Sequence, residues 1–302
     1  MPTKTSDTHP SSAVTSERYT TDSVISKDGT VIGYRQIGQG PGIVVVHGSA
    51  SSGYNHMQLA EALADTFTVY LLDRRGRGLS GPYHKNDRIL QEVEDLDALL
   101  THTGAHHVFG VSSGALICLQ AALSLPTIHK AAIYEPPFFV KEPLPTAALA
   151  RFEQELAEGK TAAALITGMQ AAQMGPPIFN IMPRWLLESL TGMMLRSEDK
   201  KGAGGYVPMR EIAPTLAYDF QMIAEMNNQM ERLRAVQAEV LLLGGSKSPA
   251  YLKAALDALE KVLPHVTRVE LLGLDHAASW NRNRGGKPEP VAQALRRSFA
   301  ES

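Results

Sequence analysis

Ser112 is the central residue of the clearest chemical motif in the sequence, Gly110-Val111-Ser112-Ser113-Gly114, which fits the pattern G-x-S-x-G. In "HVFGVSSGALICLQAAL" the motif follows a β-branched run and opens an apolar one, so a strand should pass directly into a helix. At such a junction the central serine occupies a sharp, strained turn, and small neighbours let strand and helix pass closely. Its hydroxyl would project beside a helix N-terminus, where developing negative charge is stabilised. The motif predicts that Ser112 is a nucleophile.

Two further segments supply groups that such a nucleophile needs. His276, in "RVELLGLDHAASW", follows the last predicted strand after a glycine-containing turn, and a neutral imidazole there could take the serine proton and return it. In "GIVVVHGSASSGY" a strand ends in His-Gly and a small residue, which lets a backbone N–H face an oxyanion. We expect an oxyanion hole formed by the N–H groups of Ser49 and Ser113. His47 is expected to brace its loop through hydrogen bonds rather than to act as the base.

The order of these motifs resembles a known superfamily. "HGSA", "DRRGRGLSG", "GVSSGA" and "GLDHAA" are similar, in this order, to motifs of the α/β-hydrolase superfamily with a helical cap, and the resemblance covers about residues 19–300. It implies the α/β-hydrolase fold, a nucleophile at Ser112, an oxyanion hole at Ser49 and Ser113, and a base at His276. "DRRGRGLS" matches the loop after the fourth strand, which shapes the floor of the site without doing chemistry. We therefore interpret its arginines as structural.

The acid of the triad is where the sequence departs from the commoner arrangement of that superfamily. There, the acid follows the strand that here ends at Leu243. In this chain the stretch is "LLLGGSKSPAYL", in which Ser248 stands near the expected position, and the first carboxylate onward is Asp257, well inside a predicted helix. A serine can orient an imidazole weakly but cannot offset the charge of an imidazolium.

Glu135 is the predicted acid, because it stands at the C-terminal tip of the preceding strand, Lys130–Glu135, just before two prolines that turn the chain away. Parallel strands end on one edge of a sheet, so a carboxylate there can reach His276 from the neighbouring strand. Some branches of the superfamily place their acid after this strand. Asp275 remains the main alternative, although neighbouring side chains in a loop diverge, and Asp257 and Ser248 remain further options.

Short β-branched runs alternate with helical patterns along the chain, which is typical of a mostly parallel sheet flanked by helices. The first two of eight predicted strands should form a hairpin around "KDGT". The predicted strands are Ser23–Ile25, Val31–Gln36, Ile43–His47, Thr68–Asp73, His107–Val111, Lys130–Glu135, Val240–Leu243 and Arg268–Leu272. The predicted helices are Asn55–Ala64, Arg88–Thr103, Ser113–Leu125, Pro249–Val262 and Glu289–Ala300.

Three regions follow from this pattern: a disordered leader at residues 1–18, a hydrolase core at 19–135 and 233–302, and an inserted helical cap at 136–232. The cap contains nine of the eleven methionines, which could line a yielding apolar pocket, although packing between helices explains each one as well. They are Met169, Met174, Met182, Met193, Met194, Met209, Met222, Met226 and Met230.

Composition narrows the function classes. The chain has 302 residues, a formal net charge of −2 and a single cysteine, Cys118, which gives no reason to expect nucleic acid or a disulfide framework. No apolar run is long enough to cross a membrane, so a cytoplasmic protein is expected. The cluster of His102, His106 and His107 lacks carboxylate support, and "GQGPG" leads into a strand rather than a helix. We expect neither a metal nor a cofactor.

The predicted activity is hydrolysis of a carboxylic ester or lactone with an apolar portion, through an acyl-enzyme on Ser112. A C–C bond hydrolase or a perhydrolase could use the same triad, and a non-catalytic protein that binds a small molecule could use the same scaffold. Epoxide hydrolases and haloalkane dehalogenases need an aspartate where Ser112 stands.

Overall fold

The computed structural model describes residues 19–84, 86–175, 179, 181–201 and 205–300. The leader expected at residues 1–18 lies outside them. Among the described helices, none is long and apolar enough to cross a bilayer.

The eight predicted strands form one sheet within the described residues, in the order β1-β2-β4-β3-β5-β6-β7-β8. β1 is antiparallel to β2 and β2 to β4, whereas every other neighbouring pair is parallel. The β1–β2 hairpin turns at "KDGT" as expected, with Gly29 at φ +88°. The strands are Thr20–Ile25 (β1), Val31–Ile37 (β2), Gly42–Val46 (β3), Thr68–Leu72 (β4), His107–Val111 (β5), Lys130–Tyr134 (β6), Glu239–Gly245 (β7) and Val266–Leu271 (β8).

Four strands, β3, β4, β6 and β8, end one residue earlier than the sequence predicts, and in the first three the residue left out is polar. His47, Asp73 and Glu135 each lie just beyond the last strand residue, at the edge where the parallel strands end, and each is buried. In all three cases the buried polar group follows the last apolar residue of its strand. The functional edge of the sheet therefore starts where the regular strands end.

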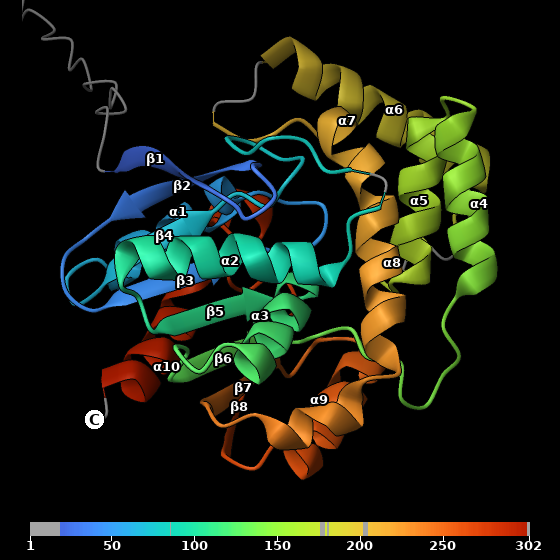
Figure 1. The fold of residues 1–302 in the computed structure, drawn as a ribbon. Coiled ribbons are helices and arrows are strands. Elements are labelled where there is room, and N and C mark those ends of the chain that lie inside the picture. The colour runs from blue at the N-terminus through green and yellow to red at the C-terminus, as the bar shows by residue number, and fades with distance from the viewer. Residues whose placement is uncertain (1–18, 85, 176–178, 180, 202–204, 301–302) are drawn as a thin grey trace, which may run out of the picture.

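Helices cover both faces of the sheet (Figure 1). Because successive side chains point to opposite faces, Ile43 and Val45 pack into a cluster with α1 and α10, whereas Val44 and Val46 pack into a cluster with α2, α3 and α9. These helices span Met57–Leu63 (α1), Ile89–Thr103 (α2), Ser113–Ser124 (α3), Ala250–Val262 (α9) and Pro288–Ala300 (α10), each within a few residues of its predicted range.

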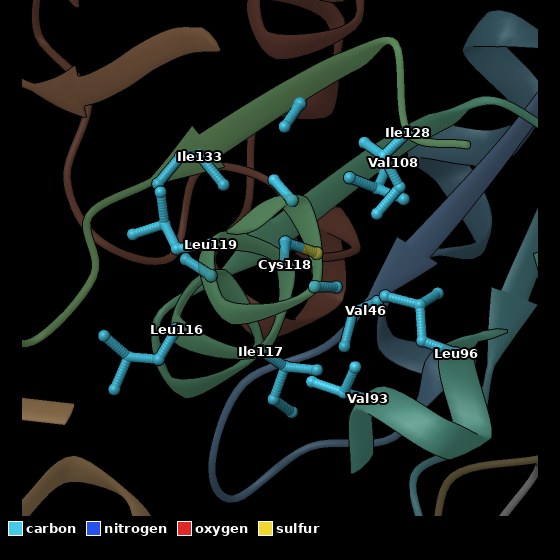
Figure 2. Packing of buried hydrophobic residues seen from close by; sticks show 14 of the residues in the cluster. Val46, Val93, Leu96, Val108, Leu116, Ile117, Cys118, Leu119, Ile128 and Ile133 are labelled. Carbon is cyan, nitrogen blue, oxygen red and sulfur yellow. The ribbon is translucent and has the colours of Figure 1, made fainter. Parts of the chain in front are cut away.

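α3, the helix that follows Ser112, is apolar on every side because it is enclosed on every side. Nearly all of its residues are buried, among them Cys118. Figure 2 shows Ile117 beside Val93 of α2, and both belong to one cluster with Ile133 of β6. A helix held in this way gives the turn before it a fixed support.

Between β6 and β7 the described residues form helices and no strand: Thr146–Ala157 (α4), Thr161–Ala171 (α5), Arg184–Lys201 (α6), Met209–Ile212 (α7) and Leu216–Asn227 (α8). They stand beyond the C-terminal ends of the central strands (Figure 1) and share a small core that includes Phe152, Leu195 and Leu216. We call this part the inserted segment.

The methionines of the inserted segment divide by environment. Met222 and Met226 of α8 are fully buried against the core of the sheet, whereas Met169, Met193 and Met194 are exposed. Of these five methionines, two therefore pack in the protein core and three face the solvent.

The close passage of β3 and α3 predicts the effect of one methyl group. A Cβ added at Gly114 would lie 2.3 Å from Val46 O and 2.5 Å from His47 O, so the backbone would have to shift. We expect Gly114→Ala to reduce the free energy of unfolding by about 1–3 kcal/mol, measured by urea denaturation. Gly192→Ala on α6 is the control, because a Cβ there meets nothing closer than 3.7 Å, and it should stabilise the protein by up to about 1 kcal/mol. Equal midpoints for Gly114→Ala and the unsubstituted protein would contradict this.

Candidate active site

Ser112 forms the sharp turn between β5 and α3. Its backbone has φ 55° and ψ −122°, a conformation that residues with side chains rarely adopt, and its N–H donates to Tyr134 O at 2.9 Å. A Cβ at Gly110 would collide with the backbone across the turn, and a Cβ at Gly114 would collide with the backbone at the end of β3. These two glycines and the bond to β6 therefore allow the turn that lifts the Ser112 side chain, which is partly exposed, from the edge of the sheet.

Glu135 reaches His276 from the end of β6. Its Oε2 lies 2.6 Å from Nδ1 of His276, and its Oε1 accepts a hydrogen bond from the N–H of Gly245 at 2.6 Å. The carboxylate is fully buried, whereas the His276 side chain is 12% exposed. Since a carboxylate only accepts, Nδ1 must carry the proton of a neutral ring, which leaves a lone pair on Nε2.

The other acid candidates lie apart from the imidazole. Asp275 accepts from the backbone N–H two residues on, and Asp257 pairs with Arg268 at the surface. Ser248 Oγ is buried without a hydrogen-bond partner among the described residues. Of the four candidates, Glu135 is the one that contacts His276.

Tyr134, which the sequence did not single out, holds the loop that carries His276. Its hydroxyl donates to the carbonyl of Asp275 at 2.7 Å, and burial raises the pKa of this phenol, so it stays a donor. A Cβ at Gly245 would lie 2.4 Å from Leu274 O, so β7 and this loop are in direct backbone contact. The loop is thus fixed on both sides of the imidazole.

The structure does not join Ser112 to His276 directly. Within the described part of the chain, the hydroxyl of Ser112 makes no hydrogen bond. Bonds between a nucleophile and its base are often long without substrate and shorten in the bound complex.

The expected oxyanion donors lie on either side of the nucleophile. Among the described residues, neither the N–H of Ser49 nor that of Ser113 finds a protein acceptor, and Ser49 Oγ donates to Ser113 Oγ at 3.0 Å. A Cβ at Gly48 would lie 2.9 Å from Ser112 Cβ, so this loop touches the nucleophile. Ala50, next in the loop, has φ 53°. Two unpaired N–H groups at such a position can donate hydrogen bonds to an anionic oxygen.

His47 braces its own loop through hydrogen bonds, as the sequence predicts. Its Nε2 accepts from the N–H of Arg74 at 3.1 Å, so Nδ1 carries the proton and donates to Gly48 O at 2.9 Å. Burial, together with the nearby Arg77, holds the pKa of this imidazole well below its usual value. Both ring nitrogens of His47 are therefore engaged in hydrogen bonds.

The fold agrees with comparisons to known proteins. A family model described as "Alpha/beta hydrolase family" matches residues 43–294. The chain belongs to the alpha/beta hydrolase family. A solved alpha/beta hydrolase from Sphaerobacter thermophilus is 31% identical, with a TM-score of 0.75 over 92% of this chain and 100% of that chain.

Two further proteins are similar to this hydrolase. A pimeloyl-[acyl-carrier protein] methyl ester esterase of Xanthomonas campestris pv. campestris is 25% identical over 271 residues, which are 87% of this chain and 97% of the relative. A thermophilic esterase from Thermogutta terrifontis shares the fold, with a TM-score of 0.69 and 16% identity over 93% of this chain and 98% of that chain.

A buried ionic network underlies the site of this hydrolase. Arg74 pairs with Glu92 at 2.7 Å and with Asp219 of α8 at 2.8 Å, and Asp219 also pairs with Arg77. All four side chains are at most about 1% exposed. Sequence reasoning missed Asp219, although an aspartate in register with apolar residues of one helix, "LAYDFQM", signals a buried charge that needs a cation.

The other histidines that the structure describes make separate contacts. Within the described residues, no three His, Cys, Asp or Glu side chains are placed to hold an ion. His106 stacks on His129 with centroids 4.4 Å apart, and His107 stacks on Phe299.

His56, just before α1, connects the segment after β3 to the loop that carries His276. Its Nδ1 bonds the carbonyl of Ser279 at 3.1 Å, three residues after His276, and its Nε2 is buried without a partner among the described residues. Burial lowers the pKa of His56 from 6.5 to about 4.

This shift predicts a pH-dependent stability. Between pH 6.5 and about 4 the unfolded chain binds a proton at His56 that the folded chain does not, so stability falls as the pH falls. From pH 7 to about 4.5 the loss due to His56 should be about 2 kcal/mol. His56→Asn keeps a donor for Ser279 O but cannot titrate. Its loss of unfolding free energy in urea over this range should be smaller by that amount, and identical losses for both proteins would contradict the assignment.

Proposed function

We propose that this protein is a serine hydrolase that cleaves a carboxylic ester or lactone through an acyl-enzyme on Ser112. The observation that carries the proposal is the 2.6 Å contact between Glu135 and His276, on the loop that follows the last strand of the sheet. A buried carboxylate that fixes the tautomer of an imidazole, at the edge of the sheet where a serine occupies a strained turn, is what acyl transfer requires.

In the first half of the reaction, Ser112 Oγ attacks the carbonyl carbon while its proton passes to Nε2 of His276. The carbonyl electron pair moves onto oxygen, and the N–H groups of Ser49 and Ser113 stabilise this oxyanion. As the oxyanion collapses, the bond to the alkoxy oxygen breaks, and that oxygen takes the proton from His276. Glu135 stabilises the transient imidazolium.

In the second half, a water molecule loses a proton to His276 and attacks the acyl-enzyme. The second tetrahedral intermediate collapses to release the acid, and the proton returns to Ser112. A lactone follows the same course, except that its alcohol and acid remain one molecule.

We propose residues 136–232 as a cap that selects a substrate with an apolar portion. In support, the inserted segment faces the edge that carries the three catalytic groups, and the chain that leaves Glu135 runs through three buried apolar residues, 136–138. The name of the Xanthomonas relative, a methyl ester esterase, also supports a carboxylic ester as the substrate class.

Covalent labelling tests the nucleophile. A fluorophosphonate should form one adduct, on Ser112, located by mass spectrometry of the digested protein, because the phosphorus centre mimics the tetrahedral intermediate. Ser112→Ala should abolish the labelling, whereas Ser248→Ala, at a buried serine that does not contact His276, should leave it unchanged. A protein that stays unlabelled would instead favour a small-molecule-binding protein on the same scaffold, and equal labelling after Ser112→Ala would place the reactive residue elsewhere.

Paired substitutions test the acid. Glu135→Gln removes the charge beside His276 while keeping the side chain's shape, and kcat on a p-nitrophenyl ester should fall by about 10³–10⁴-fold. Asp275→Asn, the neighbouring carboxylate that does not contact the ring, should retain kcat within about threefold. Similar losses in the two variants would overturn the role of Glu135.

A further inference from the structure

We propose that Arg77 is a positioning residue of the oxyanion hole, and that the inserted segment holds it in place through Thr215 and Asp219. The proposal rests on the proposed function, because it concerns how the Ser49 donor is aimed at a developing oxyanion. It gives Arg77, the third arginine of "DRRGRG", a part in catalysis beyond the structural role expected from the sequence.

The carbonyl of Gly48 accepts three hydrogen bonds. The donors to Gly48 O are Arg77 Nη1 at 3.0 Å, His47 Nδ1 at 2.9 Å and Ser51 Oγ at 2.9 Å. This carbonyl and the N–H of Ser49 belong to one planar peptide group. In a trans peptide the two point in opposite directions, so donors that fix the carbonyl also fix the direction of the N–H.

These bonds strengthen the Ser49 donor as well as orienting it. A donor on the carbonyl draws electron density from the peptide and makes its N–H a better donor, in the way that chains of hydrogen bonds polarise one another. Arg77 supplies the charged bond, and its side chain is only 1% exposed, where such interactions are least screened.

Arg77 is held by residues that come from the inserted segment. Its Nε donates to Thr215 Oγ1 at 2.9 Å, and its Nη2 pairs with Asp219 of α8. The three nitrogens of the guanidinium thus have three separate acceptors, the third being Gly48 O. Lysine, with one nitrogen, cannot reproduce this geometry.

Asp219 also reaches the second oxyanion residue. Its Oδ1 accepts a hydrogen bond from Ser113 Oγ at 3.2 Å and another from Arg74 Nη1 at 2.8 Å. Arg74 Nη1 also donates to Ser113 Oγ at 3.1 Å. One carboxylate of α8 is therefore linked to the residues that carry both oxyanion donors. The alignment of the hole depends on how the inserted segment sits on the sheet.

Enzyme kinetics with a transition-state analogue test this inference. In Arg77→Met, kcat should fall by about tenfold, less than the 10²–10³-fold typical for loss of an oxyanion donor itself, with KM within about threefold. The affinity for a trifluoromethyl ketone, to which Ser112 adds to form a tetrahedral oxyanion, should fall by the same factor as kcat/KM. Arg77→Lys keeps the charge and should lose less than Arg77→Met.

Arg75→Met is the matched control. Arg75 is an equally buried arginine of the same loop, but it pairs with Asp95, Asp87 and Asp28 and does not contact Gly48. This variant should lose stability, while kcat per folded protein and the affinity for the ketone stay within about twofold. If Arg77→Met does not fold, Thr215→Val, which removes one acceptor of Arg77, should show a smaller loss of kcat and ketone affinity in equal proportion.

Two results would overturn the inference. The first is a fall in kcat in Arg77→Met with unchanged affinity for the ketone, and Thr215→Val is judged in the same way if it has to replace Arg77→Met. The second is a loss of kcat and of ketone affinity in Arg75→Met equal to that in Arg77→Met. The proposed function would survive either result if the unsubstituted protein hydrolyses esters and Ser112→Ala does not. Absence of any Ser112-dependent turnover would instead refute the proposed function itself.

Discussion

A single buried carboxylate organises this site. Glu135 is removed from water at the end of β6, and removing a carboxylate from water is costly unless both oxygens are hydrogen-bonded. One oxygen meets the N–H of Gly245 and the other meets His276. The first bond ties the carboxylate to β7, the neighbouring strand, and the second orients the imidazole. The position of the imidazole ring thus follows from the need of the buried Glu135 carboxylate for a second hydrogen-bond donor.

Backbone strain is concentrated around the same point. Within the described residues, four residues other than glycine have positive φ, and three of them, Ala50, Ser112 and Glu135, carry or adjoin the groups of the site. Such conformations cost of order 1–3 kcal/mol each and persist where the surroundings over-determine them. Here the surroundings are the parallel strands and the enclosed helix α3, whose packing leaves the turn no room to relax.

The parts of the fold that depend on local pattern could be predicted from the sequence. Alternating and continuous apolar runs marked each strand to within about two or three residues, and the glycines around Ser112 marked its turn. The place of Glu135 beside His276 followed from parallel topology, because strand ends converge on one edge. The pairing of Asp219 with Arg74 and Arg77 could not be found in this way, since it joins residues more than a hundred positions apart through a packing angle of α8. Nor could the pattern separate a methionine on the buried face of α8, such as Met222, from an exposed one, such as Met194.

The tautomer of His276 tests the central interaction most directly. In ¹⁵N NMR spectra of histidine-labelled protein at about pH 9, where imidazoles are neutral, His276 should be present as the Nδ1–H tautomer, with Nε2 unprotonated. Glu135→Gln should shift this resonance pair toward a mixture of tautomers, because an amide can either donate or accept. A His276 that carries its proton on Nε2 in the unsubstituted protein would contradict the account, since the nitrogen that must receive the serine proton would already hold one.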